Sequence, residues 1–485
     1  MTKSTSPLSF SLPFSWIAIV TFAGFISAAA GQEISIPDDL LEAAEENAAR
    51  QTEPEPEIEI EIPDELFEPE ADTALIVDHS GTPKPAVEFD VDYFGYFHSV
   101  PGDRHFTRGD LKIEFADFLG DSFHYNLTPR FRLDSSDDTV NEFAFRENSA
   151  RRPLATFQEA YVSWASERYE VSLGKKIFNW GVADTYNPLD DLNPRDFLDV
   201  PTNDRIGVPA LSVFRFGEVF DVQAVWEPLF SPSRIPLPGI ENRWLPSFRG
   251  IPPGFDFSGR ELPSDQFENG QGAVRLSSSS LIDGWDLALS WFRGRQSAGV
   301  FRGVQVDNAI LTSLEYPRYQ ELGGSFSTVV GDWQIHGEGS WHVTDDERKD
   351  DDYLEYVFGV NRTFAGSPIP LVNEWILVFE YAGQETTRSI PEGGPFFGSR
   401  QFARPFQDAL AATVTLKVSD ETQFEFGGAY DFADSGSVVR ASFSHELSAN
   451  LELEIGSDFF SGPEDSFFGK WGANDRFFVS IALQY

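Results

Sequence analysis

Hydrophobic and polar residues alternate along most of the chain, from about residue 86 to its end. Clear examples run over 87–93, 111–115, 123–133, 375–381 and 451–455, where apolar side chains take every second position. A period of two places the two sets of side chains on opposite faces of a β-strand. The segments are about ten residues long, which suits a tilted strand that crosses a bilayer.

The connections between these segments come in two lengths that alternate along the chain. Tight turns are predicted at 119–122, 166–168, 217–218, 331–332, 419–422 and 448–450. Long connections are predicted at about 134–155, 179–207, 229–269, 296–317 and 386–405. Short periplasmic turns alternating with long outer loops are typical of outer-membrane barrels. The pattern predicts an all-β fold, a transmembrane antiparallel β-barrel of about 18 strands, with 16 as the alternative count.

The last segment carries a further signal of this class. Apolar side chains alternate up to an aromatic final residue, at Phe477, Val479, Ile481, Leu483 and Tyr485. This end resembles the C-terminal signal by which the barrel assembly machinery recognises bacterial outer-membrane barrels. We therefore expect that machinery and the outer-membrane lipid to be partners of the chain, and the bacterial outer membrane to be its location.

The first 83 residues lack this alternation and divide into two parts. Residues 1–30 have a basic start at Lys3, an apolar stretch and a small-residue end, which predicts a secretory signal peptide. Residues 31–83 form an acidic periplasmic linker, since 32–72 holds 16 acidic residues and one basic residue, Arg50. Like charges and proline favour an extended, disordered segment there. The barrel domain is then expected over 84–485.

Two other interpretations of the linker remain open. Residues 32–83 are a candidate binding segment for a periplasmic partner. Residues 72–77 also faintly resemble the energy-coupling box of TonB-dependent receptors. Those receptors carry a large plug domain before the barrel, whereas alternation begins here near Val87.

Composition excludes several classes of protein. The chain has 36 Lys and Arg against 78 Asp and Glu, a net charge of −42, and no cysteine. Disulfides, thiol catalysis and cysteine metal sites all require sulfur. A nucleic-acid partner is excluded because phosphate contacts require a basic surface.

The polar face of each strand should line the lumen, because Lys or Arg facing lipid at the midplane costs about 2–4 kcal/mol. A barrel of 16–18 strands is wide enough for water. Arg130 and Arg132 take neighbouring positions on one strand face, which suggests a row of positive charges that would attract anions. The predicted pore-lining residues are Lys112, Arg130, Arg132, Lys176, Arg215, Glu338 and Arg440. The alternative is that these charges pair with one another inside a plugged barrel.

The connection that starts near residue 178 is predicted to be a solvated loop or one folded over the pore mouth. Asn187-Pro188 and Asn193-Pro194 are turn signals within it. Its acidic residues could bind Ca²⁺, but they lack a fixed ligand spacing, so no metal or cofactor is predicted. The candidate constriction residues are Trp180, Asp184, Asp190, Asp191 and Asp196.

The segment 174–181, GKKIFNWG, followed by Asn-Pro-Arg-Asp at 193–196, resembles a marker of an uncharacterised bacterial outer-membrane barrel family. In that family a Gly-basic strand ends in Trp-Gly and leads into an Asn-Pro-x-Asp loop. The family is porin-like and loosely related to alginate-export-type barrels. The segment 225–230 and the proline-rich stretch to about Pro263 are also similar. The resemblance implies passage of hydrophobic or polymeric compounds and names no substrate.

Some outer-membrane barrels are hydrolases, which hold a nucleophile or water with a base. His336, Glu338, Ser340 and His342 share one face of one strand. Strand neighbours two positions apart point the same way without aiming at a common atom, so we expect polar lumen lining and no enzyme. The predicted function is porin-like passage of small, hydrophobic or polymeric solutes. The rival is a non-conducting barrel that anchors a periplasmic or surface partner.

Overall fold

The structure, a computed structural model, describes residues 85–98, 104–136, 138–202, 204–238, 242–245, 255–306, 309–366, 369–397 and 404–485. The predicted signal peptide and acidic linker lie outside these residues, so both remain predictions.

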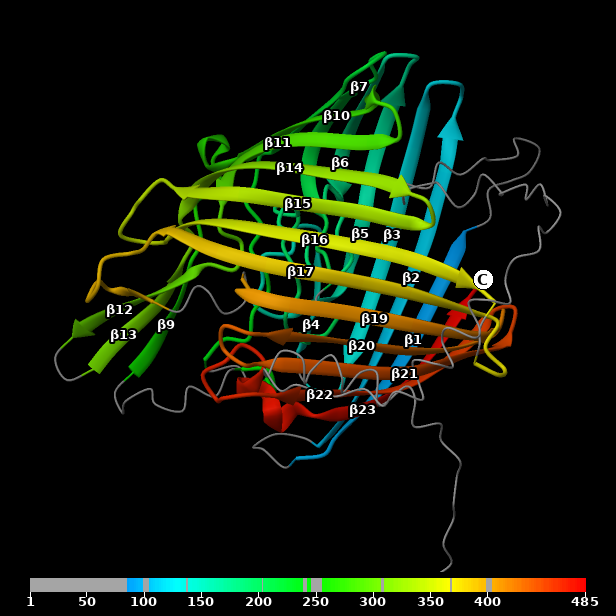
Figure 1. Ribbon diagram of the computed structural model, residues 1–485. Helices are drawn as coiled ribbons and strands as arrows, with labels where there is room; N and C mark the ends of the chain where they lie inside the picture. The colour runs from blue at the N-terminus through cyan, green and yellow to red at the C-terminus, as the bar shows by residue number, and fades with distance from the viewer. Residues whose placement is uncertain are drawn as a thin grey trace, which may run out of the picture. The chain divides into compact units, whose positions relative to one another are not determined.

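Eighteen antiparallel strands form one closed barrel, which confirms the predicted fold class and the higher strand count (Figure 1). Its first half consists of β1 (Ala86–Tyr96), β2 (His105–Leu119), β3 (Phe123–Asp134), β5 (Arg152–Ala165), β6 (Tyr169–Lys176), β7 (Val208–Arg215), β8 (Asp221–Glu227), β10 (Gln271–Ile282) and β11 (Trp285–Arg295). Its second half consists of β14 (Arg318–Val330), β15 (Trp333–Thr344), β16 (Asp352–Ala365), β17 (Glu374–Arg388), β19 (Asp408–Ser419), β20 (Thr422–Asp431), β21 (Ser437–Ser448), β22 (Leu451–Ser461) and β23 (Arg476–Gln484).

The remaining elements lie within the long connections. β4 (Thr139–Ala144) pairs in parallel with β5. β9 (Phe255–Glu261), β12 (Val300–Val306), β13 (Ala309–Glu315) and β18 (Phe396–Phe397) form a separate small sheet. Two short 3₁₀ helices are η2 (Phe267–Asn269) and η3 (Gly469–Asn474). No helix of the described residues is long and apolar enough to cross a membrane.

The barrel closes between its first and last strands. Phe89 of β1 is in register with Leu483 of β23. The backbone N–H groups of Val87 and Tyr485 each donate to the other's carbonyl oxygen, at 2.7 and 2.8 Å. The seam therefore leaves no free strand edge, as a spanning barrel requires. The alternating residues 477–484 thus belong to the closing strand, Tyr485 follows it directly, and their role as an assembly signal remains a prediction.

Short and long connections alternate as expected and sort to opposite ends of the barrel. All six predicted tight turns occur between paired strands. The turn at Asp283-Gly284 and the connection from β16 to β17 were not predicted from the sequence, and both join strands at this same end. Gly284 and Gly331 have φ of 73° and 63°, a conformation that suits glycine in tight turns. Short turns mark the periplasmic end of such barrels, so the long loops face outward.

The two strand faces differ in chemistry around the whole barrel. Large apolar side chains stay exposed on the outer face, among them Phe89, Phe131, Leu173, Leu289, Leu322, Phe358, Phe426, Ile455 and Ile481. Polar side chains on the inner face are mostly buried, as Ser163, Ser172, Glu338, Ser340 and Glu380 are. An apolar exterior around a closed barrel is what lipid requires. The protein is therefore a β-barrel of the bacterial outer membrane.

Candidate functional site: a loop that crosses the lumen

The connection 177–207, here called the inward loop, leaves β6 and enters β7 after folding into the barrel. Its apolar residues Phe178, Trp180 and Leu192 pack in a buried cluster with Phe292 of β11 and Tyr319 of β14. The Trp180 indole donates to the Gln223 side chain of β8 at 2.9 Å. Burying each large side chain contributes roughly 1.5–3 kcal/mol. The loop is therefore held against the wall rather than left in water.

The start of the family-like motif is fixed by close packing. Gly174 in β6 has φ of 143°, and a Cβ there would lie 2.2 Å from the Ala160 carbonyl oxygen of β5. Only glycine fits at this position without strain. Asn193 joins the two ends of the inward loop, because its Oδ1 accepts from the Phe178 N–H at 2.6 Å and its Nδ2 donates to the Ile206 carbonyl at 2.9 Å.

One end of the inward loop is bound by two lumenal glutamates. Glu338 of β15 accepts from the Val182 N–H at 2.6 Å and from the Leu189 N–H at 3.5 Å. Glu380 of β17 accepts from the N–H groups of the next two loop residues, Asp184 and Thr185, at 2.7 and 2.8 Å. Hydrogen bonds to a charged acceptor are stronger than neutral ones. The wall carboxylates therefore hold the backbone of residues 182–189.

The other end of the inward loop is bound by cations. Asp196 accepts from Arg152 of β5 at 2.9 Å and from Arg234 at 2.8 Å, and its carboxylate lies 3.6 Å from Arg132 of β3. Glu147, from the loop before β5, pairs with Arg132, Arg234 and with Lys175 of β6. We call these six residues the ion cluster: Arg132, Glu147, Arg152, Lys175, Asp196 and Arg234. All six are buried.

Two further acidic residues of the inward loop extend this attachment. Asp204 pairs with Arg130 of β3 at 2.7 Å, and Arg130 also pairs with Asp110 of β2. Asp199 pairs with Arg476 of β23 at 2.9 Å and lies 3.4 Å from Arg108 of β2. Arg130 and Arg132 are thus buried in ion pairs, so the expected ladder of free cations for anions is not what the lumen presents.

Strand order places the two attachments on opposite walls. The basic side chains come from β2, β3, β5, β6 and β23, whereas Glu338 and Glu380 come from β15 and β17. Strands β7 to β14 separate the walls on one side, and β19 to β22 separate them on the other. Figure 1 shows β15 to β17 in front of β2, β3 and β5. The inward loop therefore crosses the lumen.

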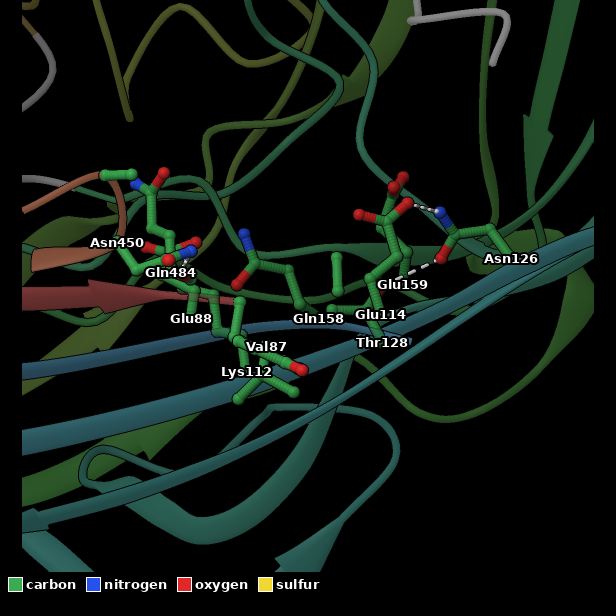
Figure 2. A pocket seen from close by; sticks show the side chains of 13 residues that line it. Val87, Glu88, Lys112, Glu114, Asn126, Thr128, Gln158, Glu159, Asn450 and Gln484 are labelled. Atoms are coloured by element: carbon green, nitrogen blue, oxygen red, sulfur yellow. Dashed lines mark hydrogen bonds and ion pairs between the residues drawn. The ribbon is translucent and has the colours of Figure 1, made fainter. Parts of the chain in front are cut away.

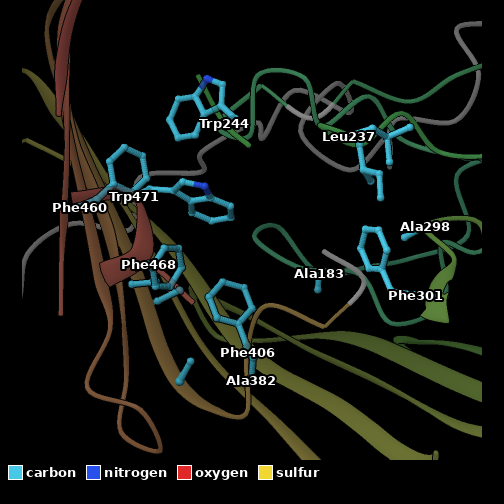
Figure 3. Close-up of a cluster of buried hydrophobic side chains, with 14 of the residues drawn as sticks. Ala183, Leu237, Trp244, Ala298, Phe301, Ala382, Phe406, Phe460, Phe468 and Trp471 are labelled. Carbon is cyan, nitrogen blue, oxygen red and sulfur yellow. The ribbon is translucent and has the colours of Figure 1, made fainter. Parts of the chain in front are cut away.

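A second loop follows β8, and its described residues also enter the lumen. We call it the proline-rich loop, of which 228–238 and 242–245 are described. Arg234 forms two backbone hydrogen bonds with the inward loop: its carbonyl oxygen accepts from the Phe197 N–H, and its N–H donates to the Arg195 carbonyl oxygen. Trp244 packs edge-on against Phe460 of β22 and Trp471 of η3, with ring centroids 5.5 and 5.9 Å apart (Figure 3). This loop thus supplies one member of the ion cluster and an aromatic core near the outer end.

The remaining predicted residues fall into different environments. Lys112 pairs with Glu88 at 2.7 Å, and Lys176 lies over the Tyr161 ring at 4.8 Å. Arg440 pairs with Asp458 at 2.7 Å and lines a cavity. Arg215 differs from the prediction, because buried Ser212 and Ala210 mark the lumenal positions of β7 and Arg215 lies on the other face, exposed beside a turn.

The predicted constriction residues all belong to the inward loop but serve different contacts. Trp180 and Asp196 hold the loop to the walls, as described above. Asp190 pairs with Arg195 and Arg205 at 2.6 Å each. Asp191 lines a cavity, and Asp184 is 46% exposed to the lumen. Glu147, Arg152 and Arg234 were not predicted as site residues, because no local motif contains them, and the pairing of Lys175 was not predicted although this residue lies within the 174–181 motif.

The described residues leave cavities toward both ends of the lumen. The periplasmic cavity has a volume of about 590 Å³ and is lined by Glu88, Lys112, Glu114, Asn126 and Glu159, among others (Figure 2). The outer cavity has a volume of about 370 Å³ and lies between the inward loop and β16 to β22. Its lining combines aromatic rings with Asp190, Asp191, Glu355, Glu425 and Asp458, against Arg195 and Arg440. Carboxylates therefore outnumber cations in both cavities.

Comparisons with solved structures return outer-membrane barrels at low similarity. OccK9 (OpdG) of Pseudomonas aeruginosa is 9% identical with a TM-score of 0.47, over 83% of this chain and 97% of that one. OpdQ of Pseudomonas aeruginosa is 9% identical with a TM-score of 0.45, over 84% and 98%. OmpT, an outer membrane protein of Vibrio cholerae, is 10% identical with a TM-score of 0.37, over 84% and 99%.

No protein-family model matches the sequence, and no curated protein matches it. The solved structures are too dissimilar in sequence to assign this chain to a family or to identify its substrate. The resemblance to an uncharacterised, alginate-export-related family therefore remains a prediction.

The ion cluster predicts how the loop responds to acid. Burial alone would raise the pKa of Glu147 and Asp196, but the surrounding arginines, with Lys175 at Glu147, hold both pKa values below their usual range. Groups with a depressed pKa stabilise the folded state above the ordinary carboxyl pKa, about 4, and lose that contribution as pH falls further. The ion-cluster end of the loop should therefore stay attached from pH 7 to about pH 4 and detach below it, which raises single-channel conductance. An unchanged conductance between about pH 4 and about pH 2 would contradict this assignment.

Proposed function

We propose that this protein is a narrow, substrate-selective channel of the outer membrane. The observation that carries the proposal is the lumen itself: a loop crosses it, held by basic side chains on one wall and by two glutamates on the other, and cavities remain on either side. A barrel of this size would otherwise hold a wide aqueous channel. A crossing loop narrows such a channel and sets what passes.

The residues that line the cavities favour the passage of small solutes, and of cations over anions. The outer cavity presents the rings of Tyr186, Phe197, Phe406 and Phe468 beside its carboxylates. Carboxylates in a narrow water-filled space attract cations, and aromatic rings accept apolar or cationic surface. We therefore favour small solutes with an apolar face over polymers, for which the crossing loops leave little room.

The alternative function is a non-conducting barrel that anchors a partner. The buried aromatic contacts of Trp244 favour it, because they fill part of the outer half of the lumen. The predicted acidic linker, residues 31–83, would then bind that partner. The two proposals differ in whether ions pass.

Conductance of the refolded mature chain in a planar bilayer tests the proposal. We expect a small, steady conductance, with a reversal potential in a KCl gradient that shows cation preference. Heat-modifiable migration in a gel would first establish that the barrel is folded. Silence from folded protein, at neutral and at acidic pH, would favour the anchor. Anion preference would contradict the proposed role of the lining carboxylates.

A further inference from the structure

Three potential metal ligands meet where the inward loop touches β15 and β17. His336 Nε2 is hydrogen-bonded to Glu380 Oε1 at 2.8 Å and lies 3.8 Å from Asp184 Oδ2, and all three atoms, which could bind a metal in place of that hydrogen bond, lie within 4.8 Å of one another. His336 and Glu380 come from the wall, and Asp184 comes from the loop. The loop fold thus assembles the group from segments far apart in the sequence.

The fold makes room for this arrangement. His336 and Glu380 face each other across Gly359 of β16, which is in register with both. A Cβ at Gly359 would lie 2.2 Å from His336 Nε2. Any other residue there would displace the imidazole. Glycine at this position therefore leaves room for the side chains of His336 and Glu380, from two different strands, to lie close enough to bind the same ion.

Within the described residues, His336 is the one basic side chain beside the two carboxylates of this group. The described residues place no Lys or Arg within salt-bridge distance of Asp184 or Glu380, and each pairs only with His336. The acidic residues of the ion cluster, in contrast, each contact at least three basic side chains. Two carboxylates, one of them almost fully buried, thus meet at one imidazole with no Lys or Arg beside them, an arrangement that a bound cation would stabilise.

The ligand set and its support match a transition metal. Imidazole nitrogen with carboxylate oxygen suits zinc and its neighbours, whereas Ca²⁺ prefers six to eight oxygens. Tetrahedral zinc ligands about 2.1 Å from the ion lie about 3.4 Å apart, within the spread of distances here. Backbone N–H groups orient Glu380, and the Asn361 amide donates to Asp184 at 2.8 Å. Hydrogen bonds of this kind are typical of carboxylates that bind a metal.

We propose that Asp184, His336 and Glu380 bind a divalent transition-metal ion, with zinc as the best match, and that the ion fastens the inward loop to the wall. Three protein ligands leave one position open, and the half-exposed Asp184 gives the ion a path from the lumen. Binding joins residue 184 to β15 and β17 by bonds in addition to the backbone hydrogen bonds of Glu380. Metal would then hold the loop in its crossing position.

Cobalt titration of the refolded, chelator-treated mature chain tests the site directly. Co²⁺ bound by imidazole and carboxylates absorbs visible light far more strongly than aqueous Co²⁺, and Zn²⁺ should displace it. We expect one equivalent to bind, and D184N and H336Q each to weaken binding at least tenfold. H98Q is the matched control, since His98 lies 3.5 Å from Asp475 in another histidine–carboxylate pair.

Asp184 is half-exposed, so D184N keeps the test valid if H336Q fails to fold. The proposal is wrong if the folded wild type gives only the aqueous Co²⁺ spectrum, or if D184N binds as tightly as wild type. It is also wrong if H98Q weakens binding as much as H336Q. Metal binding is measured here without a membrane. A silent bilayer experiment would therefore overturn the proposed channel and leave this result standing.

Discussion

Replacing Asp196 with asparagine should detach the inward loop and raise single-channel conductance several-fold. Three guanidinium groups, from Arg132, Arg152 and Arg234, converge on this one carboxylate. The substitution keeps the size of the side chain and removes its charge. Removing one partner of a buried ion pair typically costs about 3–5 kcal/mol. The cost falls on the closed loop, because the arginines repel one another once Asp196 is neutral.

Proteolysis gives a second readout for this variant. Arg195 and Arg205, both in the inward loop, are half-buried and paired with Asp190. Trypsin should cleave the loop of folded D196N and spare that of the wild type. The seam between β1 and β23 is untouched, so the barrel should still migrate as a folded species.

A control variant separates the buried cluster from surface pairing. Asp332 pairs with Arg362 at 2.7 Å, but its side chain is 72% exposed. Exposed pairs are worth about 0–1 kcal/mol. D332N should leave conductance and trypsin sensitivity unchanged. Equal behaviour of D196N and D332N would show that the ion cluster does not hold the loop.

Replacing Glu338 with glutamine should loosen the opposite attachment and make the channel flicker between two conductance levels. The carboxylate accepts from the Val182 and Leu189 N–H groups, and the amide of glutamine offers one acceptor oxygen in its place. Hydrogen bonds to charged groups contribute about 1.5–3 kcal/mol each. Since 1.4 kcal/mol is a factor of ten, the open fraction should rise about tenfold or more.

The ion cluster still holds the far end of the loop in E338Q, so we expect a smaller change than in D196N. Glu425 of β20 supplies the control, because it lines the outer cavity and, within the described residues, accepts no hydrogen bond from the inward loop. E425Q should alter ion preference without flicker. Flicker in both variants would point to lumen charge in general and not to the attachment of residues 182–189.

The barrel could be predicted from the sequence because its determinants are local. The alternation of apolar and polar residues along each strand predicts which face contacts lipid. Turn residues such as Gly331 indicate where a strand ends. The turn at Asp283-Gly284 was missed because the polar residues 277–280 precede it and blur the end of β10. The small sheet of β9, β12, β13 and β18 was missed because its strands belong to three different loops.

The site could be predicted only in part, because its partners are distant in the sequence. The acidic inward loop was identified, and so were Arg130 and Arg132, but the sequence left open whether their charges face solutes or pair with other side chains. Pairing between Asp196 and Arg152 or Arg234 depends on two loops folding into the lumen, which no spacing encodes. From the sequence, Glu380 could be predicted only as a lumenal carboxylate. Its hydrogen bonds to the backbone N–H groups of residues 184 and 185 depend on how the inward loop folds.

The inward loop has a mechanical consequence for the barrel. A wide cylinder of strands is compliant in cross-section, and lateral pressure from the bilayer tends to flatten it into an ellipse. The loop is fastened to β15 and β17 through Glu338 and Glu380, and to β3 and β5 through Asp196, Asp204 and their arginines. Because the loop joins these opposite walls, we expect it to resist widening and narrowing of the barrel along the diameter that connects them. A variant with this loop cut would therefore differ from the native protein in roundness and stiffness as well as in the width of its opening.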